Sequence, residues 1–161
     1  MKLSQETTEE TKNSILDKAF ARFGHFGFGK TTMAEISKDC DMSPGNLYRY
    51  FESKKDIGAG CARRCMQQKL ELVREIVRNP KLNPEKKLQA FALELLEYMH
   101  YQFSDQPAVM ELVDFVCHER WDIVTQYMEH ERSLLSEILS EGNRSGDFNI
   151  PDVLETADRK S

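Results

Sequence analysis

A short polar run, Ser43 to Asn46, has side chains that could read the base edges of double-stranded DNA. The amide of Asn46 can pair with adenine or another base edge, and Pro44 can offer an apolar contact to a thymine methyl group. Ser43 and Gly45 keep the rest of this surface small and polar. Arg49 follows and could reach a phosphate or a guanine. These residue types predict recognition of DNA in the major groove.

Two short helices with a tight turn between them are expected to position this run, over residues 31–51. Thr31 and Thr32 offer hydroxyl N-caps to the first helix, and Ser43 caps the second. Pro44 falls at the first position of the second helix, where its missing N–H costs nothing. The second helix should span about two turns, with an apolar side formed by Leu47, Tyr50 and Phe51. This is the pattern of a helix-turn-helix.

The same stretch resembles the DNA-binding domain of the tetracycline-repressor-like (TetR) transcription regulators. The shared residues are Ser43, Gly45, Leu47, Tyr48, Tyr50, Phe51, Ser53 and Lys54. Asp41 stands where the family usually has glycine, and Asp tolerates the left-handed conformation that this turn needs. The resemblance implies phosphate contacts by Tyr48, Lys54, and Thr31 or Thr32. The predicted DNA-binding set is therefore Thr31, Thr32, Ser43, Pro44, Gly45, Asn46, Tyr48, Arg49 and Lys54.

Composition and charge are compatible with such a protein. The chain has 161 residues, of which 40% are hydrophobic, and a net charge of −5. The acidity lies after residue 60, because the earlier part carries equal numbers of basic and acidic residues. Local potential decides phosphate binding, and five basic residues flank the second helix: Lys30, Lys38, Arg49, Lys54 and Lys55. We expect a cytoplasmic protein without a membrane segment, because the N-terminus is polar and no apolar run reaches eighteen residues.

Helical periodicity predicts an all-α protein. A first helix should begin at Thr8 or Thr11, after a frayed start, and end near Phe26. Phe26 and Phe28, in a glycine-rich turn, should both fill the small core of the first three helices. Ser53 should cap a long helix to about Arg78. Further helices are expected over residues 84–103, 105–117, 121–141 and 153–157, with Gly142 and Gly146 ending the helix over residues 121–141.

The resemblance implies two domains joined by that long helix. Residues 1–53 would form the three-helix helix-turn-helix domain, and residues 54–161 a helical domain for effector binding and dimerisation. The second domain is expected to be C-terminally short and incomplete relative to the family, whose further helices make most of the dimer interface.

A ligand cavity in the second domain is a further prediction, because methionine and aromatic side chains can line a pocket for a lipophilic molecule. The alternative is that these side chains simply fill a helical core. The candidate ligand-binding residues are Phe91, Leu95, Tyr98, Met99, Phe115, Trp121, Tyr127 and Met128.

Other chemistry has weaker support in the sequence. Asp114, His118 and Asp122 recur every four residues and could hold a metal with Glu111 or His100, although such a stripe is usually a solvated helix face. The cysteines are expected to be reduced, mostly buried thiols: Cys40, Cys61, Cys65 and Cys117. We predict no enzyme activity and no cofactor.

The predicted function is that of a sequence-specific transcription regulator, a homodimeric repressor that a small lipophilic effector releases from operator DNA. The alternative is a helical protein that binds small molecules or other proteins and has weak or lost operator binding.

Overall fold

The structure is a computed structural model that describes the backbone of residues 2–104 and 107–158 and the side chains of residues 7–97 and 108–158. Within these ranges every regular element is a helix, which confirms the all-α prediction. The chain divides into two compact units, one made of residues up to Arg64 together with Phe103–Trp121 and the other of Cys65–Gln102 together with Asp122–Ser161. No described helix is long and apolar enough to cross a membrane.

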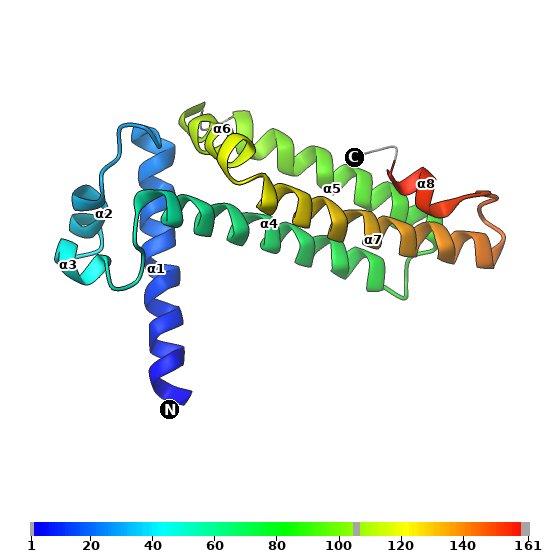
Figure 1. Cartoon of the computed structure of the whole chain (residues 1–161). Helices are drawn as coiled ribbons and strands as arrows, with labels where there is room; N and C mark the ends of the chain where they lie inside the picture. The colour runs from blue at the N-terminus through cyan, green and yellow to red at the C-terminus, as the bar shows by residue number, and fades with distance from the viewer. Residues whose placement is uncertain (1, 105–106, 159–161) are drawn as a thin grey trace. The chain divides into compact units, whose positions relative to one another are not determined.

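The first unit contains the predicted helix-turn-helix. Helix α1 (Lys2–Phe26) is followed by α2 (Met33–Asp39) and α3 (Pro44–Leu47), which lie beside it (Figure 1). The first part of α4 (Lys54–Arg78), the 3-10 turn η1 (Pro107–Val109) and α6 (Met110–Glu119) complete this unit. Its core consists of side chains with no exposed surface, namely Ile15, Ala19, Phe23, Ile36, Leu47 and Ile57. We call this unit the head.

The second unit, which we call the body, is built around one apolar cluster. The later part of α4, α5 (Pro84–Ser104), α7 (Trp121–Ser145) and α8 (Val153–Asp158) surround it (Figure 1). Their buried side chains are Leu70, Val73, Val77, Phe91, Leu134, Leu135, Ile138, Leu139 and Ala157. The buried Lys87 reaches Glu141 with its ammonium at 2.8 and 3.0 Å from the two carboxylate oxygens, which offsets the cost of burying that charge.

Helix boundaries agree with the prediction to within one residue at α4, α5 and α8, whereas the start of α1 and the end of α7 depart from it. Helix α1 begins at Lys2, so the expected frayed start is wrong; the added turns contain neither Gly nor Pro. Gly142 does not end α7, which continues to Ser145. A Cβ at Gly142 would lie 2.0 Å from the Phe148 ring, so this glycine makes room for a side chain that folds back. Gly146, with φ of +82°, follows the last helical residue.

Two predictions about buried side chains are also corrected. Phe28 is buried, but Phe26 is 51% exposed, because it is the last residue of α1 and lies under the Arg22 guanidinium at 4.9 Å instead of in the core. None of the four cysteines, all of which lie in the described part of the chain, forms a disulfide, and Cys61 is buried while Cys40 and Cys65 are half-buried. Cys117 is exposed on α6, so the thiols are not mostly buried as predicted.

Candidate nucleic-acid interface

Helix α2 is fixed at both ends by its own sequence. Thr32 is the N-cap: its hydroxyl accepts from the Glu35 N–H, and the Glu35 carboxylate accepts from the Thr32 N–H at 2.8 Å. This capping box satisfies two otherwise unpaired donors. Asp41 ends the helix in the left-handed conformation, with φ of 54°, as the sequence predicted for this turn. The turn therefore forms without the glycine usual in the family.

Helix α3 starts as predicted and is shorter than predicted. The Ser43 hydroxyl accepts from the Asn46 N–H at 3.2 Å, and Pro44 occupies the first helical position. Only Pro44–Leu47 is regular helix, whereas about two turns were expected. The Arg49 and Tyr50 N–H groups bond to the carbonyls of Asn46 and Leu47, and this tighter i to i+3 spacing is typical of a helix end. Leu47 has no exposed surface and anchors the helix on the head.

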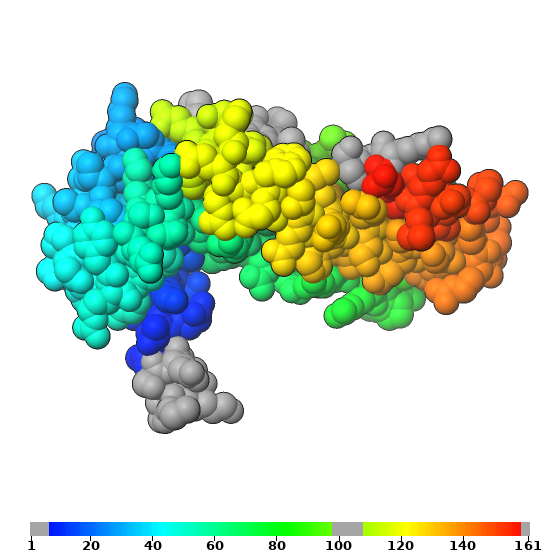
Figure 2. All heavy atoms as spheres, viewed as in Figure 1, coloured from blue at the N-terminus to red at the C-terminus, as the bar shows by residue number. Residues whose placement is uncertain are grey.

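Most of the predicted DNA-contacting side chains share one accessible surface. Ser43, Pro44, Gly45 and Arg49 are exposed, Tyr48 is 52% exposed, and Asn46 is half-buried. A Cβ at Gly45 would meet nothing within 4 Å, so the surface is open at that point. Figure 2 shows α2, in light blue, and α3, in cyan, on the visible face of the head. The structure therefore brings this part of the predicted set together.

Two predicted phosphate contacts have other partners in this structure. The Thr31 side chain is buried, and its hydroxyl donates to the Gly27 carbonyl at 2.8 Å, so it is not available to a phosphate. Thr32, next to it, is exposed at the N-terminus of α2. The Lys54 ammonium donates to the carbonyls of Phe28 and Gly29 at 2.7 and 3.0 Å. Partial burial lowers the pKa of Lys54, while Glu111 and Glu35 act in the opposite direction.

A charged pair between α1 and α2 braces the helix-turn-helix. The Arg22 guanidinium donates two hydrogen bonds to the Asp39 carboxylate, one through Nε and one through Nη2 at 2.9 Å. Lys18 donates to the Asp39 backbone carbonyl at 2.6 Å. The hydrogen bonds from Arg22, more than its charge, hold the pKa of Asp39 below its ordinary value. A fork-to-fork pair of this kind fixes direction as well as distance.

This pair predicts a pH-dependent contribution to stability. Because the folded pKa of Asp39 is lowered, the contribution is present above the unfolded pKa and is lost as pH falls through the folded pKa. Asp39→Asn should lower the free energy of unfolding by about 1 kcal/mol at pH 7, a value discounted for solvent exposure. The difference from wild type should shrink as the pH falls below the ordinary aspartate pKa of 3.8 and should vanish once the pH has passed the lowered pKa of folded Asp39. Urea titrations of both proteins across this range measure it, and a pH-independent difference would contradict the assignment.

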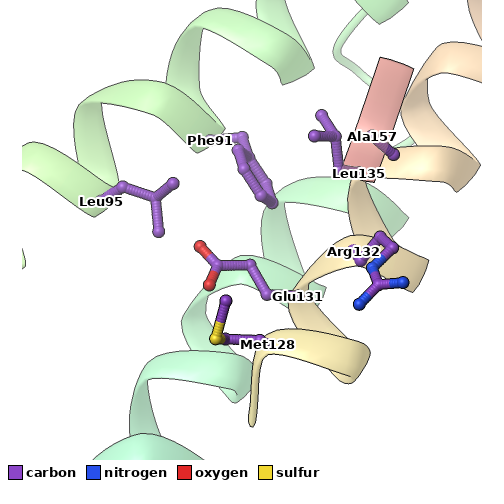
Figure 3. A pocket seen from close by; sticks show the side chains of 7 residues that line it. All are labelled: Phe91, Leu95, Met128, Glu131, Arg132, Leu135 and Ala157. Atoms are coloured by element: carbon purple, nitrogen blue, oxygen red, sulfur yellow. The ribbon is translucent and has the colours of Figure 1, made fainter. Parts of the chain in front are cut away.

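The predicted ligand-binding residues are divided between the two units. Phe91, Leu95 and Met128 line a cavity of about 170 Å³ in the body, together with Glu131, Arg132, Leu135 and Ala157 (Figure 3). Tyr127 packs against the body core instead, with the Lys69 ammonium 5.1 Å from its ring. Phe115 and Trp121 belong to the head and are not among the residues that line this cavity. The side chains of Tyr98 and Met99 lie outside the described residues.

Two polar residues of the cavity were not identified from the sequence. In Figure 3 the Glu131 carboxylate and the Arg132 guanidinium lie among the apolar side chains. One guanidinium nitrogen of Arg132 reaches Asp158 of α8 at 3.0 Å, and its Nε is buried with no hydrogen-bond partner among the described residues. Charged residues on an amphipathic helix usually face solvent, so their positions along α7 gave no signal of a cavity.

The structure gives no support to the alternative of a metal site. Among the described residues, no three His, Cys, Asp or Glu side chains lie close enough together to hold an ion. His118 lies 3.1 Å from the Asp114 carboxylate, and both side chains are 74% exposed. Glu111 instead contacts the loop before α2. The His100 side chain lies outside the described residues.

Sequence comparisons agree with this architecture. Residues 15–59 match the family model described as bacterial regulatory proteins of the tetR family, and residues 84–159 match the tetracyclin repressor-like C-terminal domain. The chain is 28% identical to the HTH-type transcriptional regulator UidR of Escherichia coli over 141 residues, which are 88% of this chain and 56% of UidR. It is 24% identical to the HTH-type transcriptional repressor KstR2 of Mycobacterium tuberculosis over 148 residues, 88% of this chain and 70% of KstR2.

Solved structures show the same fold. A TetR/AcrR-family regulator from Thermobifida fusca superposes with a TM-score of 0.76 at 16% identity, over 92% of this chain and 78% of that one. The regulator FadR of Bacillus subtilis, in complex with stearoyl-CoA, superposes with a TM-score of 0.66 at 21% identity, over 91% of this chain and 78% of FadR.

The fold and the site together define the class of this protein: an all-α protein with an N-terminal helix-turn-helix. The chain belongs to the TetR family of bacterial transcriptional regulators, a family of regulators and not of enzymes. It spans about half the length of UidR.

Proposed function

We propose that this chain is a cytoplasmic transcription repressor that binds operator DNA through α3. The observation that carries the proposal is the group of exposed residues at α3, Ser43–Gly45, Tyr48 and Arg49, which the buried Leu47 holds on the head. Gly45 and Asn46 would approach base edges, while Tyr48 and Thr32 would contact phosphates. Lys30 and Lys38 are exposed and lie a short distance before this run in the sequence. They would attract DNA phosphates whatever the base sequence.

The repressor would act as a homodimer on an inverted repeat. Two reading helices about one DNA turn apart would bind two half-sites, and linking two heads would raise the affinity far above that of one. We also propose that residues 1–53 carry the contacts to DNA and residues 54–161 those to effector and partner.

Enrichment of binding sites from a library of random DNA duplexes tests the proposed function. The protein should enrich an inverted repeat whose half-sites are about one helical turn apart. A library that shows no enriched sequence after several rounds, with folded protein, would contradict operator binding and favour a protein that binds only ligands or other proteins.

A lipophilic effector is the second part of the proposal. A cavity of about 150 Å³ lined by Leu, Ile and Phe can bind benzene, so the body cavity of 170 Å³ could take a ring or a short chain segment of a larger ligand. The solved complex of FadR with stearoyl-CoA supports a lipophilic effector by family likeness. To release DNA, the effector must bind the DNA-free state more tightly, because coupling between two sites is reciprocal.

Filling the cavity should abolish effector binding. Compounds that raise the melting temperature of the wild type would first be found by a thermal-shift screen of lipophilic molecules. Leu95→Trp, which fills part of the cavity, should weaken binding of such a compound at least tenfold. Leu93→Trp is the matched control, because Leu93 is on the same helix, is 51% exposed and does not line the cavity. Equal binding by both variants would place the effector elsewhere.

A further inference from the structure

The loop between α1 and α2, Gly27–Gly29, is held by hydrogen bonds at each of its ends. The Gly27 N–H donates to the Phe23 carbonyl at 2.9 Å, and the Gly27 carbonyl accepts from Thr31. Lys54 donates to the other two carbonyls. The Gly29 N–H donates to the Glu111 carboxylate at 2.7 Å. This last contact joins the loop to α6, across 82 positions of the sequence.

The carboxylate of Glu111 fits closely against the loop. A Cβ built at Gly27 would lie 2.8 Å from one Glu111 oxygen and 2.9 Å from the other, and Gly27 has φ of +90°. The backbone conformation therefore favours glycine there, and a Cβ would push the end of the Glu111 side chain away from the loop. At Gly29 a Cβ would lie 3.2 Å from the same carboxylate. Two glycines thus let one acidic side chain approach the backbone.

Apolar packing fixes the same loop from its inner side. The Phe28 ring stacks on Phe115 of α6 with centroids 4.8 Å apart and meets Phe23 of α1 edge-on at 5.1 Å. A Cβ at Gly58 of α4 would lie 2.8 Å from the Phe28 ring and 3.1 Å from Leu112 of α6. Helix α6 therefore contacts the loop through both a hydrogen bond and a ring stack, in agreement with its membership of the head.

The loop leads directly into the element that carries DNA recognition. Thr32, three residues after Gly29, is the N-cap of α2, and α2 packs against α3. A displacement of Gly29 would move the start of α2 and with it the reading helix, while Arg22 holds the other end at Asp39. Binding constellations must be held within about 0.5 Å to be effective, so the loop's anchor matters for affinity.

We propose that Glu111 is a positioning residue for DNA binding: by accepting from the Gly29 N–H it sets the position of α2 and α3 from a helix outside the helix-turn-helix. The inference rests on the proposed operator binding.

Three variants test this proposal against the duplex enriched from the random library. Glu111→Ala removes the acceptor and should weaken operator binding about fivefold. Glu111→Gln keeps an oxygen that can accept from the Gly29 N–H and should stay within twofold of wild type. Asp114→Asn is the control for charge: it removes one carboxylate from the same helix, and Asp114 is 74% exposed and contacts His118 of its own helix.

Amide hydrogen exchange separates positioning from general stability. In Glu111→Ala the Gly29 amide should exchange at least fivefold faster, while core amides such as that of Ile36 keep the wild-type rate. A uniform acceleration throughout the head would overturn the proposal in favour of a purely structural role. So would Glu111→Ala binding operator as tightly as Asp114→Asn, or Glu111→Gln binding as weakly as Glu111→Ala. Failure of the wild type to bind any duplex would instead overturn the proposed function, and this inference with it.

Discussion

Replacing Phe28 by alanine is expected to lower the free energy of unfolding of the head by about 3–5 kcal/mol, the range for removing a buried phenylalanine. The ring is 7% exposed and lies between Phe23 and Phe115, with the Lys54 ammonium 4.8 Å from its centroid. Its removal leaves a cavity among α1, α4 and α6 and weakens the anchor of the Gly27–Gly29 loop. Such a loss is a large share of the total stability of a small domain.

The matched control is Phe26→Ala, two residues earlier. Phe26 is 51% exposed, and its ring lies under the Arg22 guanidinium at 4.9 Å, so its loss should cost about 0.5–1 kcal/mol. Urea unfolding followed by fluorescence measures both, because the one tryptophan of the sequence, Trp121, belongs to the same unit as Phe28. Equal destabilisation by the two variants would contradict the different burial of these rings.

Asn46→Ala is expected to weaken binding to the operator by about 1–3 kcal/mol while leaving non-specific DNA binding unchanged. Asn46 is half-buried, and its backbone N–H is satisfied by Ser43, so the substitution should leave the head folded. The loss would come from the amide, which in the proposed complex would pair with a base edge and would have no role in attraction to phosphates. Titrations with the enriched duplex and with a scrambled duplex at one salt concentration separate the two effects.

A control for this variant is Asn149→Ala, an exposed asparagine in the body. It should bind both duplexes as the wild type does. If Asn46→Ala lost the same affinity for both duplexes, Asn46 would be a phosphate-positioning residue and the direct readout by its amide would be wrong.

The fold was predictable because local signals agree along the chain. Thr32, Ser43 and Ser53 each precede an apolar periodic segment, and each caps the helix that follows or accepts from its first N–H groups. Asp41 adopts the left-handed conformation expected of the turn. The predicted helix boundaries were wrong where tertiary packing, and not the local sequence, determines the end of a helix. The sequence predicts a helix end at Gly142, but this residue lies within α7, where its lack of a side chain leaves room for the Phe148 ring.

The exposed residues of the DNA-binding site were predictable from the sequence, whereas the residues that hold this surface in position were not. The residues of α3 follow one another in the sequence, so their common face could be inferred from helical spacing alone. Nothing in the local pattern distinguishes Phe26 from Phe28, and only packing against Phe115 does so. Glu111 reads as an ordinary charge on a solvated helix face, because its partner Gly29 is 82 positions away. The resemblance to the TetR family also gave no indication that the Lys54 ammonium donates to the carbonyls of Phe28 and Gly29.

The most direct test of the account is the ratio of the dissociation constants for a scrambled and an enriched duplex, measured with the wild type at about 150 mM salt. A reading helix that recognises base edges predicts a ratio of about a thousand or more. Both affinities should fall as salt rises, because phosphate contacts contribute to each. A ratio near one would mean that the exposed surface of α3 attracts DNA without reading it, and would contradict the proposed repressor.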